Sequence, residues 1–115
     1  MESRGEVEVV DSVLVALADP TRRHLLDLLA DQGEVTATIL ARQLPVSRQA
    51  VVKHLAVLDA AGLVSSNRVG REMRYAVQSA ALDKTVRWMA ALAANWDRRL
   101  ATIKRVAEAA ERDPG

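Results

Sequence analysis

The feature that most constrains the fold is a pair of short helical patterns with a turn of only a few residues between them. The first pattern covers residues 37–44 and stops at Pro45, which cannot continue the hydrogen-bond ladder of a helix. The second pattern starts after Ser47, a favourable N-cap, and its apolar face consists of Val51, Leu55 and Leu58. Two helices joined by so tight a turn predict a helix-turn-helix over residues 37–61.

The opposite face of the second helix is mostly polar and contains no carboxylate. It presents Arg48, Gln49, Val52, Lys53 and Ala56. Residues 42–74 carry six basic and two acidic side chains, whereas residues 1–41 carry three and eight. A basic surface of this kind suits a polyanion, although a solvated face explains the charge excess equally well on charge alone.

Two more helices are expected before this motif. In residues 6–18, apolar side chains recur at helical spacing, at Val7, Val10, Leu14 and Leu17. Asp19 and Pro20 then form a helix start signal, because aspartate caps free amides and proline has no amide to leave unsatisfied. The second helix is expected over residues 20–31, and Thr36 is the next N-cap.

After the helix-turn-helix, the apolar pattern changes to a period of two and predicts a β-hairpin over residues 63–77. Arg68, Arg71 and Arg74 place guanidinium groups on this projection, and contact with DNA phosphates is their natural use. The alternative is a solubilising hairpin in which Glu72 neutralises one arginine.

A long final helix is expected over residues 79–110, with an apolar seam of about 3.5-residue period. The seam consists of Leu82, Val86, Met89, Ala93, Trp96, Leu100, Ile103 and Ala107. Trp88 and Leu92 add a second apolar edge, and a chain of this size has little core with which to cover both. We therefore expect self-association, the alternative being that the stripe packs entirely within its own subunit.

Length and composition exclude several classes of protein. The 115 residues predict a single domain, residues 1–115, and no apolar stretch approaches the ~18 residues of a membrane span. The acidic start, Met1 to Val10, lacks the order of a signal peptide, so we expect a cytoplasmic protein with no membrane partner. Without cysteine there is no disulfide, thiolate ligand or thiol switch. No glycine-rich phosphate loop or catalytic constellation is present, so neither enzymatic activity nor a cofactor is predicted.

A series of motifs resembles a known family. They are Ala16-Leu17-Ala18-Asp19-Pro20-Thr21-Arg22-Arg23, Leu44-Pro45-Val46-Ser47, Lys53-His54-Leu55, Leu58, Ala61-Gly62-Leu63-Val64 and Gly70-Arg71. In this order they resemble the ArsR/SmtB repressors over nearly the whole chain. The resemblance implies a mainly α-helical winged helix-turn-helix, with four helices, a β-hairpin wing and a fifth helix. It also implies a homodimer paired through the terminal helices, with the fourth helix entering the major groove of DNA.

The chain departs from the family's pattern where metal-sensing members bind their effector. Those members use cysteines on the third helix, which here reads Thr38-Ile39-Leu40-Ala41-Arg42, or Asp and His pairs on the last helix, which here has no histidine. His24 and His54 lie on different helices and are expected to pack or to contact phosphate. We therefore expect no metal site, and the effector stays unknown. With Trp88 and Trp96, the last helix resembles a branch often accompanied by a partner of helix-grip ligand fold.

The residues expected to contact DNA fall into two groups. Base edges are assigned to Arg48, Gln49 and Val52, since arginine pairs with guanine, glutamine with adenine, and valine contacts the thymine methyl. The DNA backbone is assigned to Ser47, Lys53, His54, Arg68, Arg71 and Arg74. The dimer interface is assigned to Val10, Leu14, Leu17, Leu82, Val86, Met89, Trp96, Leu100 and Ile103. Relatives commonly carry a hydroxyl at Val52 and a long polar side chain at Ala56, so fewer base contacts are expected here.

The predicted function is sequence-specific transcriptional repression by a homodimer bound to a palindromic operator. Its half-sites would be about one helical turn, ~10 base pairs, apart. The alternative is a winged-helix module for protein interaction or non-specific nucleic-acid binding, since winged folds serve both uses. The basic face of Arg48 and Lys53 argues against pure protein binding.

Overall fold

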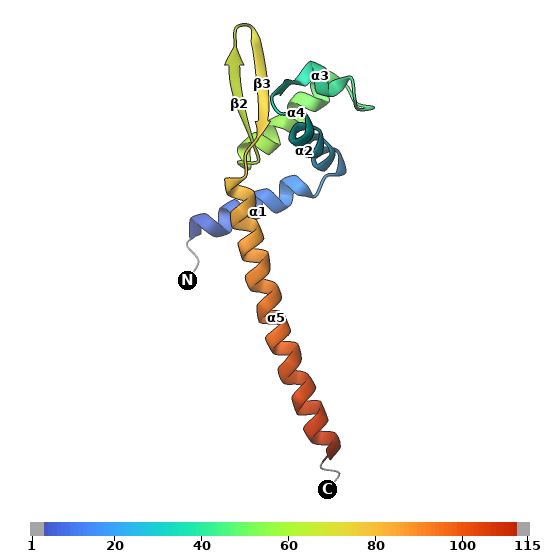
Figure 1. Ribbon diagram of the computed structural model, residues 1–115, viewed down its shortest axis with the longest axis vertical. Coiled ribbons are helices and arrows are strands. Elements are labelled where there is room, and N and C mark those ends of the chain that lie inside the picture. The colour runs from blue at the N-terminus through green and yellow to red at the C-terminus, as the bar shows by residue number, and fades with distance from the viewer. Residues whose placement is uncertain (1–3, 113–115) are drawn as a thin grey trace. The chain divides into compact units, whose positions relative to one another are not determined.

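The computed structural model describes residues 4–112 (Figure 1). Its elements are α1 (Arg4–Leu17), α2 (Pro20–Gln32), β1 (Val35–Thr36), α3 (Ala37–Ala41), α4 (Arg48–Ala60), β2 (Val64–Val69), β3 (Glu72–Val77) and α5 (Ala80–Arg112). The chain forms two compact units, the first ending at Thr85 and the second beginning at Val86. The mainly helical winged-helix class is confirmed, while assignment of the whole chain to a single domain stays a prediction.

Local capping sets where three of the helices begin, and all three predicted N-caps are confirmed. The Asp19 carboxylate accepts a hydrogen bond from the N–H of Thr21 at 2.8 Å, and Pro20 occupies the first helical position of α2. The hydroxyls of Thr36 and Ser47 accept bonds from the backbone N–H three residues later, at 3.3 and 3.1 Å. These bonds satisfy amides that have no partner within their own helices.

Helix α3 is shorter than predicted, because it ends at Ala41 and not at Leu44. Its last turn tightens, with the N–H of Gln43 donating to the carbonyl of Leu40 at 3.0 Å. Leu44 precedes a proline, which disfavours helical backbone at that position. The chain turns there and buries the Leu44 side chain.

The core lies in the first unit and is almost entirely aliphatic. Its fully buried large side chains include Leu25, Leu29, Leu40, Leu55, Leu58 and Leu63. The predicted stripe of the first helix is partly wrong, since Val7 is 42% and Leu14 38% exposed. Val10, Val13 and Ala16 are buried instead. Apolar residues nearly encircle this helix, so only packing against α2 and α4 decides which side turns inward.

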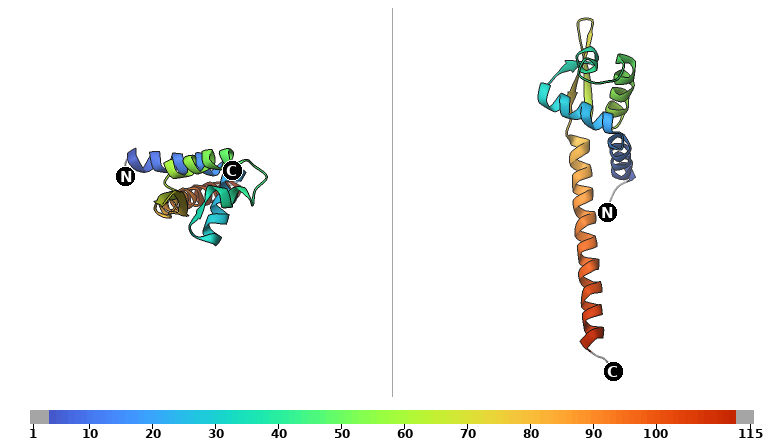
Figure 2. Two further views of the ribbon diagram at one scale, coloured as in Figure 1. Left: turned by 90° about the horizontal axis from the view of Figure 1, so that it is seen from above. Right: turned by 90° about the vertical axis from the view of Figure 1, so that its right-hand side faces the viewer.

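The predicted hairpin is confirmed, but it belongs to a three-stranded antiparallel sheet of order β1-β3-β2. Strand β1 is two residues long, too short to give a period-two pattern, and it pairs Val35 with Tyr75. Gly70 has φ +64° and occupies the first position of the two-residue turn, where a type II′ hairpin favours glycine. The hairpin projects beyond α3 and α4 (Figure 1; Figure 2, right).

Helix α5 begins in the first unit, where Ala81 packs against the core and the buried Thr85 hydroxyl donates to the Ala81 carbonyl at 2.9 Å. The second unit consists of the rest of this helix, and residues 86–112 include no buried side chain. Among the helices of residues 4–112, none combines the length and the hydropathy that crossing a bilayer requires.

We expect Gly62→Ala to destabilise the protein by about 2 kcal/mol, more than Gly70→Ala does. Both glycines have positive φ, which costs an alanine roughly 1–2 kcal/mol. At Gly62 an added Cβ would also lie 3.2 Å from the Ala81 Cβ, whereas nothing lies within 4 Å at Gly70. Urea denaturation of both variants checks this, and equal losses would show that helix α5 does not approach Gly62 so closely.

Candidate nucleic-acid interface

Helix α4 divides into a buried aliphatic face and an exposed face, as predicted. Val51, Leu55 and Leu58 are 0% exposed. The opposite side chains are exposed, namely Arg48, Gln49, Val52, Lys53 and Ala56. Because the helix buries only its aliphatic side, its carboxylate-free side is free to meet a ligand, and the base-reading roles of Arg48, Gln49 and Val52 stay predictions.

An open groove of 540 Å³ lies between α3, α4 and the wing. Three arginines line it, Arg42 from the end of α3, Arg48 from the start of α4 and Arg71 from the hairpin turn, together with Glu72. Sequence reasoning assigned no role to Arg42, although it is the first basic residue of the basic segment. Only the tertiary structure brings it to the groove that Arg48 and Arg71 share.

The three arginines of the wing do not share one face. Arg68 pairs with Met73 across the hairpin, and Arg74 follows Met73 directly, so Arg68 and Arg74 lie on opposite faces of the sheet. Arg74 Nε lies 3.9 Å from Glu72 Oε2, with both side chains well exposed. Surface pairs of this kind are weak, so Glu72 leaves the wing with a surplus of positive charge.

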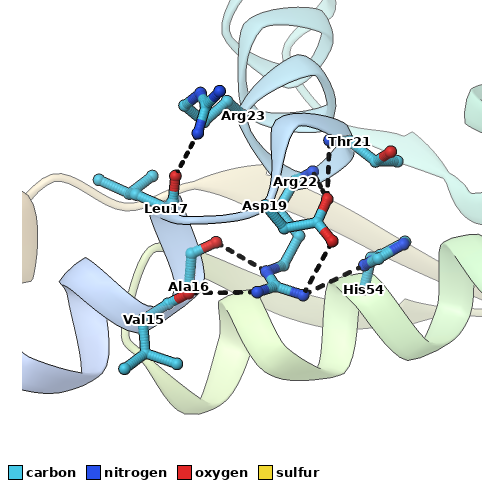
Figure 3. A network of polar contacts seen from close by, with 8 residues as sticks. All are labelled: Val15, Ala16, Leu17, Asp19, Thr21, Arg22, Arg23 and His54. Atoms are coloured by element: carbon cyan, nitrogen blue, oxygen red, sulfur yellow. Dashed lines mark hydrogen bonds and ion pairs between the residues drawn. The ribbon is translucent and has the colours of Figure 1, made fainter.

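A polar network joins the first turn of α2 to α1 and α4 (Figure 3). Arg22 Nε donates to the carbonyl of Ala16 at 2.6 Å and Arg22 Nη2 donates to the carbonyl of Val15 at 3.1 Å. Arg22 Nη1 lies 3.7 Å from the Asp19 carboxylate and 3.4 Å from His54 Nδ1. The Asp19-Pro20-Thr21-Arg22 motif therefore holds the end of α1, the start of α2 and the recognition helix α4 together.

His54 was predicted to contact the DNA backbone, and its place in this network gives it a structural contact as well. Arginine can only donate, so Nδ1 acts as the acceptor and the neutral ring carries its proton on Nε2. The half-buried ring lies beside Arg22 (Figure 3). Contact between His54 and phosphate stays a prediction.

We expect Arg22→Ala to destabilise the protein by about 1.5–3 kcal/mol, because it removes charge-assisted hydrogen bonds to carbonyls at the end of α1. Arg23→Ala is the control, since Arg23 is exposed and donates to one carbonyl, that of Leu17. Its loss should stay below about 1 kcal/mol. Thermal and urea denaturation measure both, and equal losses would contradict a special role for Arg22.

Partial burial opposes ionisation of the Asp19 carboxyl, but the backbone N–H groups of Arg22 and Thr21 and electrostatic attraction to Arg22 and His54 outweigh it. The pKa of Asp19 is therefore lowered from its ordinary value of 3.8. In acid the unfolded chain binds a proton that the folded chain resists. The resulting stability is present above the ordinary pKa and is lost as the pH falls through the folded pKa.

Accordingly, we expect Asp19→Asn to flatten the acid limb of the stability profile. Urea denaturation from about pH 6 down to about pH 3 should show wild type losing stability more steeply than the variant, because asparagine does not titrate in this range. Parallel profiles would contradict the lowered pKa of Asp19.

The predicted interface residues are placed differently from one another. Val10 is only 3% exposed and is withdrawn from the interface, because its own subunit already buries it. Leu17 is half-buried against the core, and Leu14 and Leu82 are 38% and 37% exposed. The α5 residues Val86, Met89, Trp96, Leu100 and Ile103 are between 52% and 64% exposed.

Comparison with known proteins places this architecture among bacterial regulators. A helix-turn-helix domain family matches residues 17–67. Transcriptional repressor SdpR of Bacillus subtilis (strain 168) is 34% identical over 80 residues, which cover 70% of this chain and 88% of SdpR. An ArsR-like transcriptional regulator from Rhodococcus sp. RHA1 superposes with a TM-score of 0.80 at 48% identity, over 90% of this chain and 96% of its own. The crystal structure of another ArsR family transcriptional regulator superposes with a TM-score of 0.74 at 27% identity, over 84% and 97%.

The capped turn, the exposed basic helix and the projecting hairpin define a winged helix-turn-helix protein of the DNA-binding class. The relatives extend this assignment beyond the helix-turn-helix to the wing and the flanking helices. The chain belongs to the ArsR/SmtB family of winged-helix transcriptional regulators, and it is a DNA-binding regulator.

Proposed function

We propose that this regulator is a cytoplasmic homodimeric repressor that binds an imperfect palindrome, with one α4 helix in the major groove of each half-site. The observation that carries the proposal is the exposed face of α4, which is basic, lacks carboxylates and has an aliphatic opposite side buried in the core. Arg48, Gln49 and Val52 would read bases. The backbone would be contacted by Ser47, Lys53, His54, Arg68, Arg71 and Arg74.

Dimerisation is supported by the exposed apolar stripe of α5. Trp96, Leu100 and Ile103 are each more than half exposed, and large apolar side chains at coiled-coil spacing favour burial against a second copy. Two-fold symmetry would repeat the recognition helix ~34–36 Å away, which matches successive major grooves on one side of the duplex. SdpR is named a transcriptional repressor, which favours repression here as well.

We propose no metal effector and no catalytic activity. The chain has no cysteine. Within residues 4–112, histidine and carboxylate side chains form no group of three that could hold a metal ion. Release from DNA would then require a ligand or partner that favours a different arrangement of the two subunits.

The test is selection of bound duplexes from a genomic library, followed by fluorescence anisotropy with the selected duplex and a scrambled duplex at two salt concentrations. We expect the selected duplex to bind roughly 10³-fold more tightly and to contain an inverted repeat. Equal affinities would favour the non-specific nucleic-acid module. Failure to bind either duplex would favour a protein-interaction module.

A further inference from the structure

We propose that Thr38 is a positioning residue that holds the Arg48 guanidinium toward the DNA and thereby sets base discrimination. This inference rests on the proposed function, because it concerns how the recognition helix reads its site. Thr38 lies on α3, outside the recognition helix, and the sequence alone gave it no role.

A single hydrogen bond carries the geometric argument. Arg48 Nε donates to Thr38 Oγ1 at 3.1 Å across the turn of the helix-turn-helix. Both side chains are exposed, and both line the groove between α3, α4 and the wing. Among residues 4–112, Arg48 forms no salt bridge, so its charge is available to a ligand from outside the subunit.

The chemistry of the guanidinium gives this bond its consequence. Arginine carries five N–H donors in one rigid plane, and Thr38 occupies only the donor on Nε. The two terminal nitrogens stay free, and together they match the O6 and N7 acceptors of guanine. A side chain fixed before binding also avoids an ordering cost, which corresponds to roughly 2- to 12-fold in affinity.

An Arg48 released from Thr38 would keep its charge but lose its direction. It would then satisfy itself on any nearby phosphate, and phosphate contacts carry no sequence information. Loss of the Thr38 hydroxyl should therefore reduce discrimination between duplexes and leave the salt dependence of binding unchanged.

The experiment compares Thr38→Val with Thr38→Ser in the full chain, using the selected duplex and its scrambled version as probes. Valine has the shape of threonine without the acceptor, and serine keeps the acceptor. We expect Thr38→Val to lower the ratio of the two affinities by roughly 2- to 12-fold, and Thr38→Ser to retain it. Both positions are exposed, so melting temperatures near that of wild type confirm that folding is intact.

A double-mutant cycle separates positioning from direct contact. In an Arg48→Ala background, Thr38→Val should have no further effect, because there is no guanidinium left to hold. A persistent effect in that background would show that Thr38 touches DNA itself and would overturn the inference. Discrimination by wild type that Thr38→Val preserves would also overturn it while leaving the proposed function intact. Equal affinity of wild type for both duplexes would instead overturn the proposed function.

Discussion

The double substitution Arg48→Glu and Lys53→Glu should lower affinity for the selected duplex by roughly a thousandfold or more. Arg48 is proposed to read a base, and a good bidentate pair is worth about 1–3 kcal/mol. Lys53 is proposed to contact phosphate, and both glutamates would add repulsion from the DNA backbone. Fluorescence anisotropy at low salt measures the loss.

Stability should change little, because both side chains lie on the exposed face of α4. A loss of affinity with an unchanged melting temperature would therefore report on binding and not on folding. The salt dependence gives a second readout, since each lost phosphate contact should reduce the slope of log K against log salt by about 0.9.

The matched control is Lys84→Glu with Arg87→Glu, which changes the net charge by the same amount. Both residues lie on α5, outside the helix-turn-helix and the wing, and both are exposed. We expect this control to weaken binding only slightly, through the long-range field of the protein. If it lost as much affinity as the α4 variant, binding would depend on overall charge and not on the face of α4.

The second large effect is expected at α5, where Leu100→Asp with Ile103→Asp should convert the dimer to a monomer. These side chains are 62% and 64% exposed in the single chain. Burying such a residue contributes about 1.5–3 kcal/mol, and a buried unpaired carboxylate adds a further cost. Dimer dissociation should increase by at least roughly a thousandfold, as measured by analytical ultracentrifugation.

Affinity for DNA should fall with dimerisation, because a monomer engages only one half-site. Specific complexes are typically 10³ or more times tighter than non-specific ones, and much of that margin should be lost. Raising the protein concentration should restore binding in part. A variant that stays dimeric, or a monomer that binds the palindrome as tightly as wild type, would contradict the proposed assembly.

Ala94→Asp with Ala101→Asp is the matched control on the same helix. It adds the same two charges at exposed positions, but these positions lie outside the apolar seam and outside its second edge. The control should remain dimeric and bind DNA nearly as wild type does. Equal dissociation of the two variants would show that negative charge anywhere on α5 is sufficient to separate the subunits.

Features that depend on residues close together in the chain could be predicted from the sequence. Ser47 caps α4 through an amide three residues away, and the inward side of α4 follows from the spacing of Val51, Leu55 and Leu58. The hairpin followed from alternation over adjacent residues, and its turn from Gly70. The helix-turn-helix, the wing and the basic face of α4 were therefore determined by the sequence alone.

Packing between distant segments decided the remainder, because apolar and polar patterns do not specify which neighbour an element will meet. The sequence could not show that Val13 and Ala16 turn inward on α1, or that two residues of β1 extend the wing. It could not bring Arg22 to His54, 32 residues apart, or Thr38 to Arg48. These contacts need the tertiary structure, since each depends on the angle at which two helices pack and not on the order of residues within either one.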